Sequence, residues 1–261
     1  MLLDHCVILV HELEQAVRDY ETLGFTVSPG GVHADGRTHN ALIPFADGTY
    51  LELIAFRTDD GSGHPWWRAA QAGGGLVDWA LAADGVAERV ADLTAAGLPF
   101  APSQDGGRLR PDGLELRWRG ARPAPEHGLP FLIEDLTSRD LRVPGGAART
   151  HANGTTGITC VVVAVPELDA AARAYERVLG VAAPAPMPDP LLAAEAVPLP
   201  CGEATVQLTS ASAGPIHERL HRLGSGPYAL LLCTGHARLG WLDPVLSHGA
   251  PIRLQPADEW R

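Results

Sequence analysis

The spacing of apolar residues changes several times along the N-terminal part of the chain. LLDHCVILV is a largely apolar run, which predicts a buried β-strand, and it carries two polar residues, Asp4 and His5, of which His5 is the one that does not obviously belong there. Over residues 11–23 the apolar side chains recur every three or four positions, as in an amphipathic helix, and Gly24 suits the position after its end. FTVSPGG, THNALIPF and TYLELIAF then predict three strands. The unit is therefore βαβββ.

The same unit recurs along the chain. From Gly157, VPELDAAARAYERVLG matches the earlier VHELEQAVRDYETLG, and AAEAVPL and ATVQLTS predict the following strands. A weaker copy begins at LVDWALAA, continues with a helix that Asp84 can N-cap, and predicts strands at LPFAPS, LELRWRG and PFLIEDL. A fourth begins at GPYALLLC and runs out at Arg261. The repeat predicts an α+β protein of tandem βαβββ modules with mixed sheets.

The modules are expected to pair into two domains. The first domain is predicted over residues 1–140, and the second, degenerate because its last module is truncated, over 155–261. The stretch RDLRVPGGAARTHANG, rich in Pro, Gly and Arg, is interpreted as the linker.

Composition narrows the class of protein. The 261 residues carry a net charge of −11, which argues against nucleic acid and anionic membrane as partners. No apolar run reaches the roughly 20 residues of a membrane span, and the N-terminus lacks the basic region of a signal peptide. The four cysteines form no CxxC pair, so free thiols are expected. These features favour a cytoplasmic protein.

The paired modules resemble the vicinal oxygen chelate superfamily, which has the glyoxalase, bleomycin-resistance and extradiol dioxygenase fold. THNALIPFADGTYLELIAF, HPWWRAAQAGGGLVDWAL and RPDGLELRW with PFLIED are similar to its glyoxalase-like domain proteins. The resemblance implies that two modules curl into one cup, with metal ligands on the first and last strands of each module. It fixes no reaction, because one fold serves many chemistries.

Four residues occupy those strands. His5 and Asp78 stand equally far before the glycine that ends the next helix, and Glu52 and Glu134 lie in the last strands of modules one and two. The resemblance implies that they are metal ligands, with Asp78 the weakest because its side chain is short. Glu134 is expected to be either a ligand or a catalytic general base. One histidine with several carboxylates suits Zn, Ni, Mn, Fe or Mg.

The second half of the chain serves as an internal control. Aligned on the repeat, Cys160 replaces His5 and Gln207 replaces Glu52, while alanines stand opposite His39 and Asn40. The C-terminal copy keeps the scaffold and loses the polar residues. This contrast favours a functional cup in the first domain over a core histidine that happens to be hydrogen-bonded.

Further residues are candidates for substrate contact. His39 and Asn40 open one strand of module one, Trp79 follows Asp78, and Arg110 lies on the hairpin of module two. An arginine at the rim of the cup is able to hold a carboxylate, although a solvated hairpin accounts for it equally well.

One motif is a decoy. HERLH at 217–221 fits the zinc-protease pattern H-E-x-x-H, but the repeat assigns it to a connector between modules, and the third histidine of the extended motif is replaced by Pro227. A surface helix is expected there.

The preferred hypothesis is a divalent-metal-dependent enzyme of the lyase, isomerase or dioxygenase type that acts on a small oxygen-rich substrate. The alternative is a non-catalytic protein of the bleomycin-resistance type that sequesters a small molecule. A role of the C-terminal domain in a homodimer or as a lid is left open.

Overall fold

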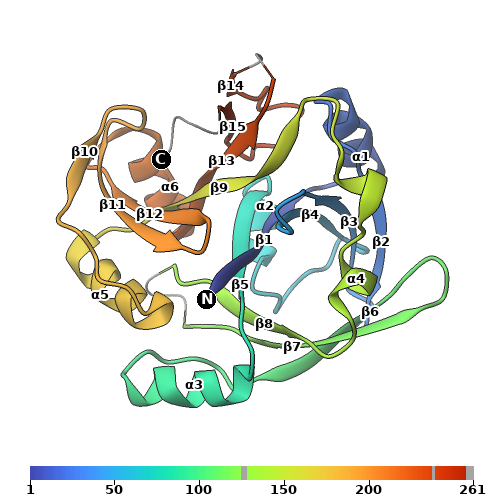
Figure 1. The fold of residues 1–261 in the computed structure, drawn as a ribbon, viewed down its shortest axis with the longest axis horizontal. Helices are drawn as coiled ribbons and strands as arrows, with labels where there is room; N and C mark the ends of the chain where they lie inside the picture. Colours follow the sequence, from blue (N-terminus) through green and yellow to red (C-terminus); the bar gives the residue numbers. More distant parts are fainter. Residues whose placement is uncertain (125–127, 237–238, 257–261) are drawn as a thin grey trace.

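The computed structural model describes residues 1–124, 128–236 and 239–256. The described strands form two curled sheets (Figure 1). The first half of the chain builds a closed barrel in the order β1-β4-β3-β2-β6-β7-β8-β5, and the second half builds a seven-stranded sheet. The prediction of an α+β protein made of tandem βαβββ modules is confirmed, with the first cup closed into a barrel.

Module one contributes one half of the barrel. Its elements are β1 (Leu2–Leu9), α1 (Leu13–Thr22), β2 (Ser28–His33), β3 (Thr38–Pro44) and β4 (Tyr50–Phe56). β1 runs parallel to β4, and β4, β3 and β2 follow as antiparallel neighbours. Gly24 has a φ of 89°, a left-handed conformation that glycine adopts readily, so it ends the helix as predicted.

Module two contributes the other half. After the short α2 (Trp67–Gln71), its elements are β5 (Gly75–Ala82), α3 (Val86–Ala95), β6 (Gln104–Leu109), β7 (Glu115–Ala121) and β8 (Phe131–Asp135). Antiparallel pairing of β1 with β5 and of β2 with β6 closes the barrel. The strand predicted at LPFAPS is wrong: Phe100 makes one isolated bridge with Pro123, and the strand lies later, at β6.

The second half repeats the plan of the first. Two short helices, α4 (Arg139–Arg142) and the 3-10 helix η2 (Gly146–Arg149), precede it. Its elements are β9 (Thr155–Ala164), α5 (Leu168–Leu179), β10 (Met187–Asp189), β11 (Ala194–Cys201), β12 (Ala204–Ser210), α6 (Gly214–Leu223), β13 (Gly226–Thr234), β14 (Gly240–Trp241) and β15 (Ile252–Gln255). The sheet order is β10-β11-β12-β9-β13-β15-β14.

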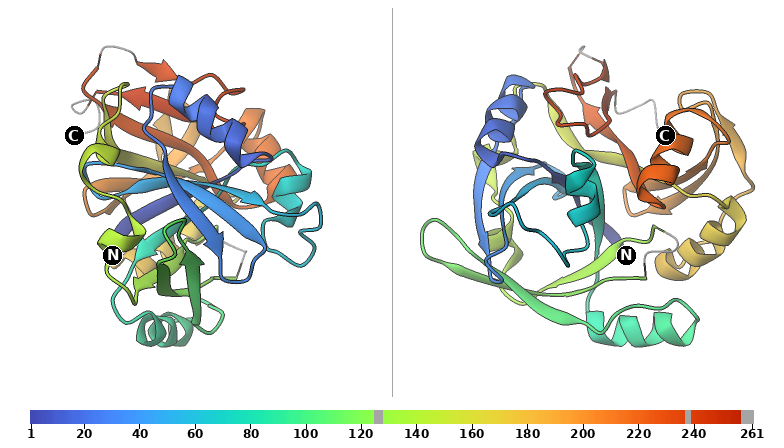
Figure 2. Two further views of the ribbon diagram at one scale, coloured as in Figure 1. Left: turned by 90° about the vertical axis from the view of Figure 1, so that its right-hand side faces the viewer. Right: turned by 180° about the vertical axis from the view of Figure 1, so that it is seen from behind.

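The two sheets pack against each other (Figure 2). Trp79 of β5 is fully buried and stacks on Tyr175 of α5, with ring centroids 6.3 Å apart. Their side chains belong to one hydrophobic core that both halves share. No helix in the described ranges is both long and apolar enough to cross a bilayer.

The HERLH segment lies on α6, as expected of a surface helix. The imidazoles of His217 and His221 are exposed and their Nε2 atoms are 3.0 Å apart. The four cysteines are free, as predicted.

Candidate functional site

The interior of the barrel holds a cavity of about 330 Å³, called the cup below. Side chains alternate between the two faces of a strand. Thr38 and Asn40 of β3, and Tyr50 and Glu52 of β4, therefore line the cup together. Glycine at position 30 of β2 makes room for this arrangement, because a Cβ there would stand 1.9 Å from Asn40 Oδ1.

Glu52 is the centre of the polar cluster in the cup. Its Oε1 accepts a hydrogen bond of 2.6 Å from Asn40 Nδ2. His5 Nε2 lies 3.5 Å from Oε2, and His33 Nε2 lies 3.5 Å from Oε1. Glu52 is 7% exposed and His5 is 2% exposed. The structure thus brings His5, Asn40 and Glu52 together as predicted neighbours and adds His33 to them.

A second layer of residues orients His5. Its Nδ1 bonds Asp4 Oδ1 at 2.6 Å, and its ring stacks on Tyr50 with centroids 4.5 Å apart. Asp4 is fully buried and accepts hydrogen bonds of 2.9 and 3.0 Å from Arg142, which also donates to Asp135 and to the Tyr50 hydroxyl. A carboxylate on Nδ1 leaves Nε2 directed at Glu52 and fixes the orientation of the ring.

The charges of the cluster are shifted in opposite directions. Burial by itself would raise the pKa of Glu52, but hydrogen bonding with His5, the charges of both histidines and the Asn40 amide lower it to about 2. Burial favours neutral His5, yet Asp4 and Glu52 outweigh it and raise its pKa. The pKa of His33 is lowered, by burial and by Arg108. Glu52 is therefore ionised at neutral pH, and the two imidazoles beside it differ in basicity.

Glu134 does not lie in the cup. Its carboxylate accepts the backbone N–H groups of Gly85 and Val86 at 3.3 and 3.2 Å, so it caps the N-terminus of α3. The prediction that Asp84 caps α3 is wrong, because the Glu134 carboxylate takes that role. On β8 the alternate residues Phe131 and Ile133 face the cup instead. A role for Glu134 as ligand or general base in the cup does not fit this placement.

Asp78 occupies the place that matches His5. In the antiparallel pairing of β1 with β5, His5 lies opposite Ala80 and Asp78 lies opposite Val7. Asp78 therefore has the same place on β5 that His5 has on β1. The Asp78 carboxylate, however, accepts hydrogen bonds from Trp66 Nε1, at 2.9 Å, and from Arg122. It anchors a cup-lining arginine and does not reach the cluster around Glu52.

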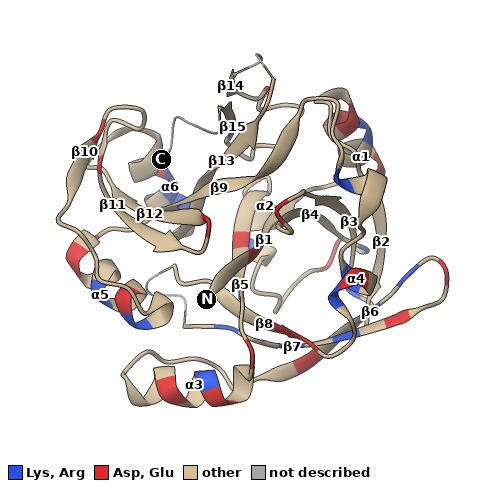
Figure 3. Ribbon diagram, viewed as in Figure 1, with Lys and Arg blue, Asp and Glu red and all other residues tan. Residues whose placement is uncertain are grey.

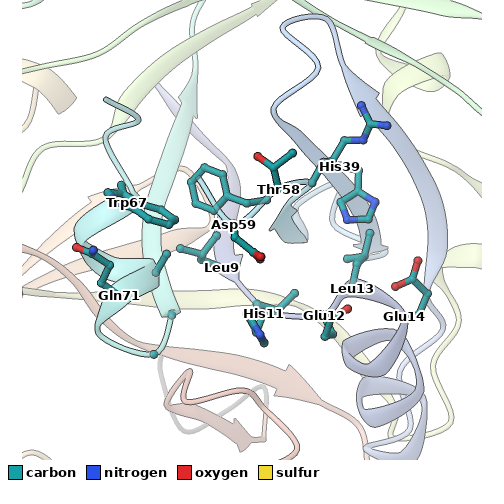
Figure 4. Close-up of a pocket in the computed structure, with 16 residues that line it drawn as sticks. Leu9, His11, Glu12, Leu13, Glu14, His39, Thr58, Asp59, Trp67 and Gln71 are labelled. Carbon is teal, nitrogen blue, oxygen red and sulfur yellow. The ribbon is translucent and has the colours of Figure 1, made fainter. Parts of the chain in front are cut away.

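The four candidate substrate-binding residues do not lie in one place. Only Asn40 lines the cup; His39 faces the opposite side of β3, in a second cavity of about 670 Å³ at the ends of β1 and β4 (Figure 4). Trp79 is fully buried in the core. Arg110 bonds Leu141 O and Asp112 at the surface. None of these three lines the cup.

Sequence reasoning missed three cup residues. His33 and Trp118, whose rings meet edge to face at 5.9 Å, line the wall, and Arg108 is 3% exposed. His33 follows a bulge between Pro29 and Gly31, which resets the alternation of β2. The strand predicted at LPFAPS ends before Arg108, whereas β6 includes it.

The cluster has donors for a divalent metal ion, which the family resemblance implies. Two donor atoms about 2.1 Å from a tetrahedral ion stand roughly 3.4 Å apart. The 3.5 Å between His5 Nε2 and Glu52 Oε2 fits this spacing. His33 faces the other oxygen of Glu52, and no group of three or more His, Cys, Asp or Glu side chains in the described ranges is placed to hold a metal. The fit is therefore to His5 and Glu52 as two protein ligands.

The C-terminal sheet confirms the alignment used as a control. Val162 of β9 pairs with Gln207 of β12 in the same register as Val7 with Glu52, so Cys160 matches His5. Cys160 packs with Val162, Ala229 and Leu231 in a small apolar cluster. Gln207 Nε2 donates to Asp189 at 2.6 Å. The second half thus replaces the acidic and imidazole groups by neutral ones on the same scaffold.

Comparisons with known proteins agree with this geometry. The sequence profile of a family described as "Glyoxalase-like domain" matches residues 3–179. A hypothetical protein from Staphylococcus aureus superposes with a TM-score of 0.75 at 12% identity, covering 97% of this chain and 98% of the other. A mutant 4-hydroxymandelate synthase from Streptomyces coelicolor superposes with a TM-score of 0.62 at 17% identity, covering 90% and 71%. At these identities the structural likeness shows a shared fold. A search of curated proteins finds no match.

Proposed function

Because the chain belongs to the glyoxalase-like domain family, we propose that its N-terminal barrel is a divalent-metal-dependent enzyme acting on a small oxygen-rich molecule in the cup. The observation that carries the proposal is the facing pair of His5 Nε2 and Glu52 Oε2, 3.5 Å apart and both buried. Two buried acceptors that face each other need a proton or a cation between them. The Asp4 bond to Nδ1 is the outer partner typical of a metal-bound histidine.

In this proposal His5 and Glu52 hold the ion, and water or substrate oxygens supply its other ligands. When bound, a divalent ion supplies a Lewis acid that stabilises negative charge developing on a substrate oxygen. The side chains of the barrel orient the two ligand residues and transfer protons to or from the substrate. Asn40 holds Glu52, Asp4 holds His5, and His33 carries protons at its Nε2, which lies at the wall of the cup. His33 takes the general-base role expected of Glu134.

The metal requirement is tested by thermal unfolding of chelator-treated protein titrated with Mn²⁺, Ni²⁺, Zn²⁺ or Mg²⁺. The exposed His217–His221 pair is a competing chelate, so all measurements use a His217→Ala background. We expect a metal-dependent rise in Tm that His5→Gln and Glu52→Gln abolish. His39→Gln and Glu134→Gln are matched controls, since they make the same changes outside the cup, and they should keep the rise.

The proposal fails if no ion stabilises the protein, or if the cup variants respond as the controls do. A companion calorimetric measurement follows the protons released on metal binding. A metal that replaces the proton on His5 releases that proton to the buffer, so the heat of binding should depend on the ionisation enthalpy of the buffer.

The second candidate is a protein that sequesters a small ligand without chemistry. The observation in its favour is that the cup offers aromatic walls, Trp66, Trp118 and Phe131, beside a site with only two placed metal ligands. Such a protein would be stabilised by an aromatic ligand in the presence of chelator and would show no response to any of the four metals.

A further inference from the structure

The arginines that line the cup differ in how they are neutralised. Basic positions of the barrel gather on β6, β7 and α4 (Figure 3). Arg142 is paired with Asp4 and Asp135, and Arg122 is paired with Asp78. These two guanidinium groups have fixed carboxylate partners supplied by the barrel itself.

Arg108 has no such partner. It is 3% exposed, and its two Nη atoms donate to the neutral acceptors Asn40 Oδ1, at 3.2 Å, and Arg142 O, at 2.9 Å. Its Nε is buried and, within the described part of the chain, has no hydrogen-bond partner. No carboxylate of the described residues forms an ion pair with it. The Asn40 amide connects it to Glu52, because Asn40 Oδ1 accepts from Arg108 and Asn40 Nδ2 donates to Glu52.

A buried cation without a direct counter-ion is costly, and a buried N–H without an acceptor adds to that cost. An anion bound in the cup would supply the missing counter-charge. A guanidinium presents its donors in a plane that matches a carboxylate, which is the geometry of the strongest neutralising pairs in proteins.

We propose that the cup binds a small organic carboxylate, with the Arg108 guanidinium, which lines the cup and lacks a carboxylate partner among the described residues, as its counter-charge. The inference rests on the proposed function, whose substrate class it names. Asn40 bonds both Arg108 and Glu52, so the bound acid group would lie within one side chain of the metal-binding pair. A cavity of about 330 Å³ is at the small end for ligand sites, and Trp118 and Phe131 give it apolar walls for the organic part.

The test uses isothermal titration of metal-free protein in chelator with two matched pairs, benzoate with benzamide and lactate with lactamide. Within each pair the carboxylate is replaced by a neutral amide of nearly the same size and shape, while the organic part stays the same. We expect at least one acid to bind about tenfold or more tightly than its amide, the effect of one charge-assisted hydrogen bond. Arg108→Met should abolish the preference, and Arg108→Lys, which keeps the charge and lacks the planar fork of donors, should weaken it.

Arg110→Met is the matched control, because Arg110 lies one residue beyond β6 and bonds only at the surface; it should keep the wild-type preference. The proposal is overturned if acids and amides bind equally or not at all, or if the preference survives in a folded Arg108→Met protein. Tighter binding of phenyl phosphate than of benzoate would overturn the carboxylate assignment. The acid–amide titration is done in chelator and therefore does not depend on a metal. If no metal stabilises the protein but the preference for acids is observed, only the enzyme proposal fails.

Discussion

Replacing Arg142 should destabilise the fold more than replacing any arginine on the surface. Arg142 is 3% exposed and donates two hydrogen bonds to Asp4, two to Asp135 and one to the Tyr50 hydroxyl. Burial by itself raises the pKa of Asp4, but the charges and hydrogen bonds of Arg142 and His5 together outweigh burial and hold that pKa well below its usual range. Asp4 therefore stays ionised and depends on Arg142 for its counter-charge.

Arg142→Met preserves the length and the apolar part of the side chain and removes the charge. Breaking a buried ion pair by deleting one partner costs about 3–5 kcal/mol. Arg139, which also bonds Asp4, remains and limits the loss to the lower end. We expect the free energy of unfolding at pH 7 to fall by about 3 kcal/mol. Urea unfolding followed by tryptophan fluorescence measures it, with an unchanged m value showing that the transition stays two-state.

Arg110→Met makes the same change at a side chain that is 31% exposed and bonds Asp112 at the surface. It should cost less than about 1 kcal/mol. Adding Asp4→Asn to Arg142→Met should recover part of the loss, because the uncompensated carboxylate is then gone. The reasoning is refuted if Arg142→Met unfolds within about 1 kcal/mol of the wild type.

Three further outcomes are expected. Glu134→Ala should lower the free energy of unfolding by about 1 kcal/mol, as a lost helix cap does, and leave the metal response of the cup unchanged. Trp79→Ala should cost about 3–5 kcal/mol in a urea melt, whereas Trp79→Phe, which removes an N–H that finds no acceptor in the described ranges, should cost less than about 1.5 kcal/mol. Burial and two arginines lower the pKa of His64 to about 4, so the unfolded chain takes up its proton first as pH falls below about 6.5. The wild type should lose about 1 kcal/mol between pH 6.5 and 4, after discounting for solvent around this half-buried ring, and His64→Gln should flatten that part of the stability profile.

The repeat in the sequence is sufficient to predict the fold and two members of the polar cluster. Helix spacing and the closing glycines fix the module, and the register of the second half then identifies His5 and Glu52 as positions where the two copies differ. These predictions succeed because strand and helix periods are local properties of the chain.

The other site residues depend on strand parity, which the sequence does not fix. Adjacent residues of a strand face opposite sides, so His39 and Asn40 cannot both line one cavity. In FLIED the sequence pattern does not show which alternate residues face the cup. The start of α3 lies against the outer face of β8, and Glu134 points to that helix and away from the cup. The bulge that turns His33 inward leaves only the weak signal of the glycine pair at 30–31.

The contrast with the degenerate half supports the proposal that the polar lining of the barrel has a function beyond the fold. At the position of His5 the second sheet places Cys160 in a fully apolar cluster, and at the position of Glu52 it places a neutral amide satisfied by Asp189. The second sheet, which stays open, therefore forms on the same scaffold with neutral side chains at both positions. Among the described residues the barrel gathers the facing His5–Glu52 pair, the ion pairs of Arg142 and an Arg108 Nε without an acceptor around one cavity, although apolar packing of similar volume is commonly no less stable. Because Asn40 bonds Glu52 on one side and Arg108 on the other, this arrangement supports the proposal of a ligand that meets the His5–Glu52 pair and a guanidinium at once.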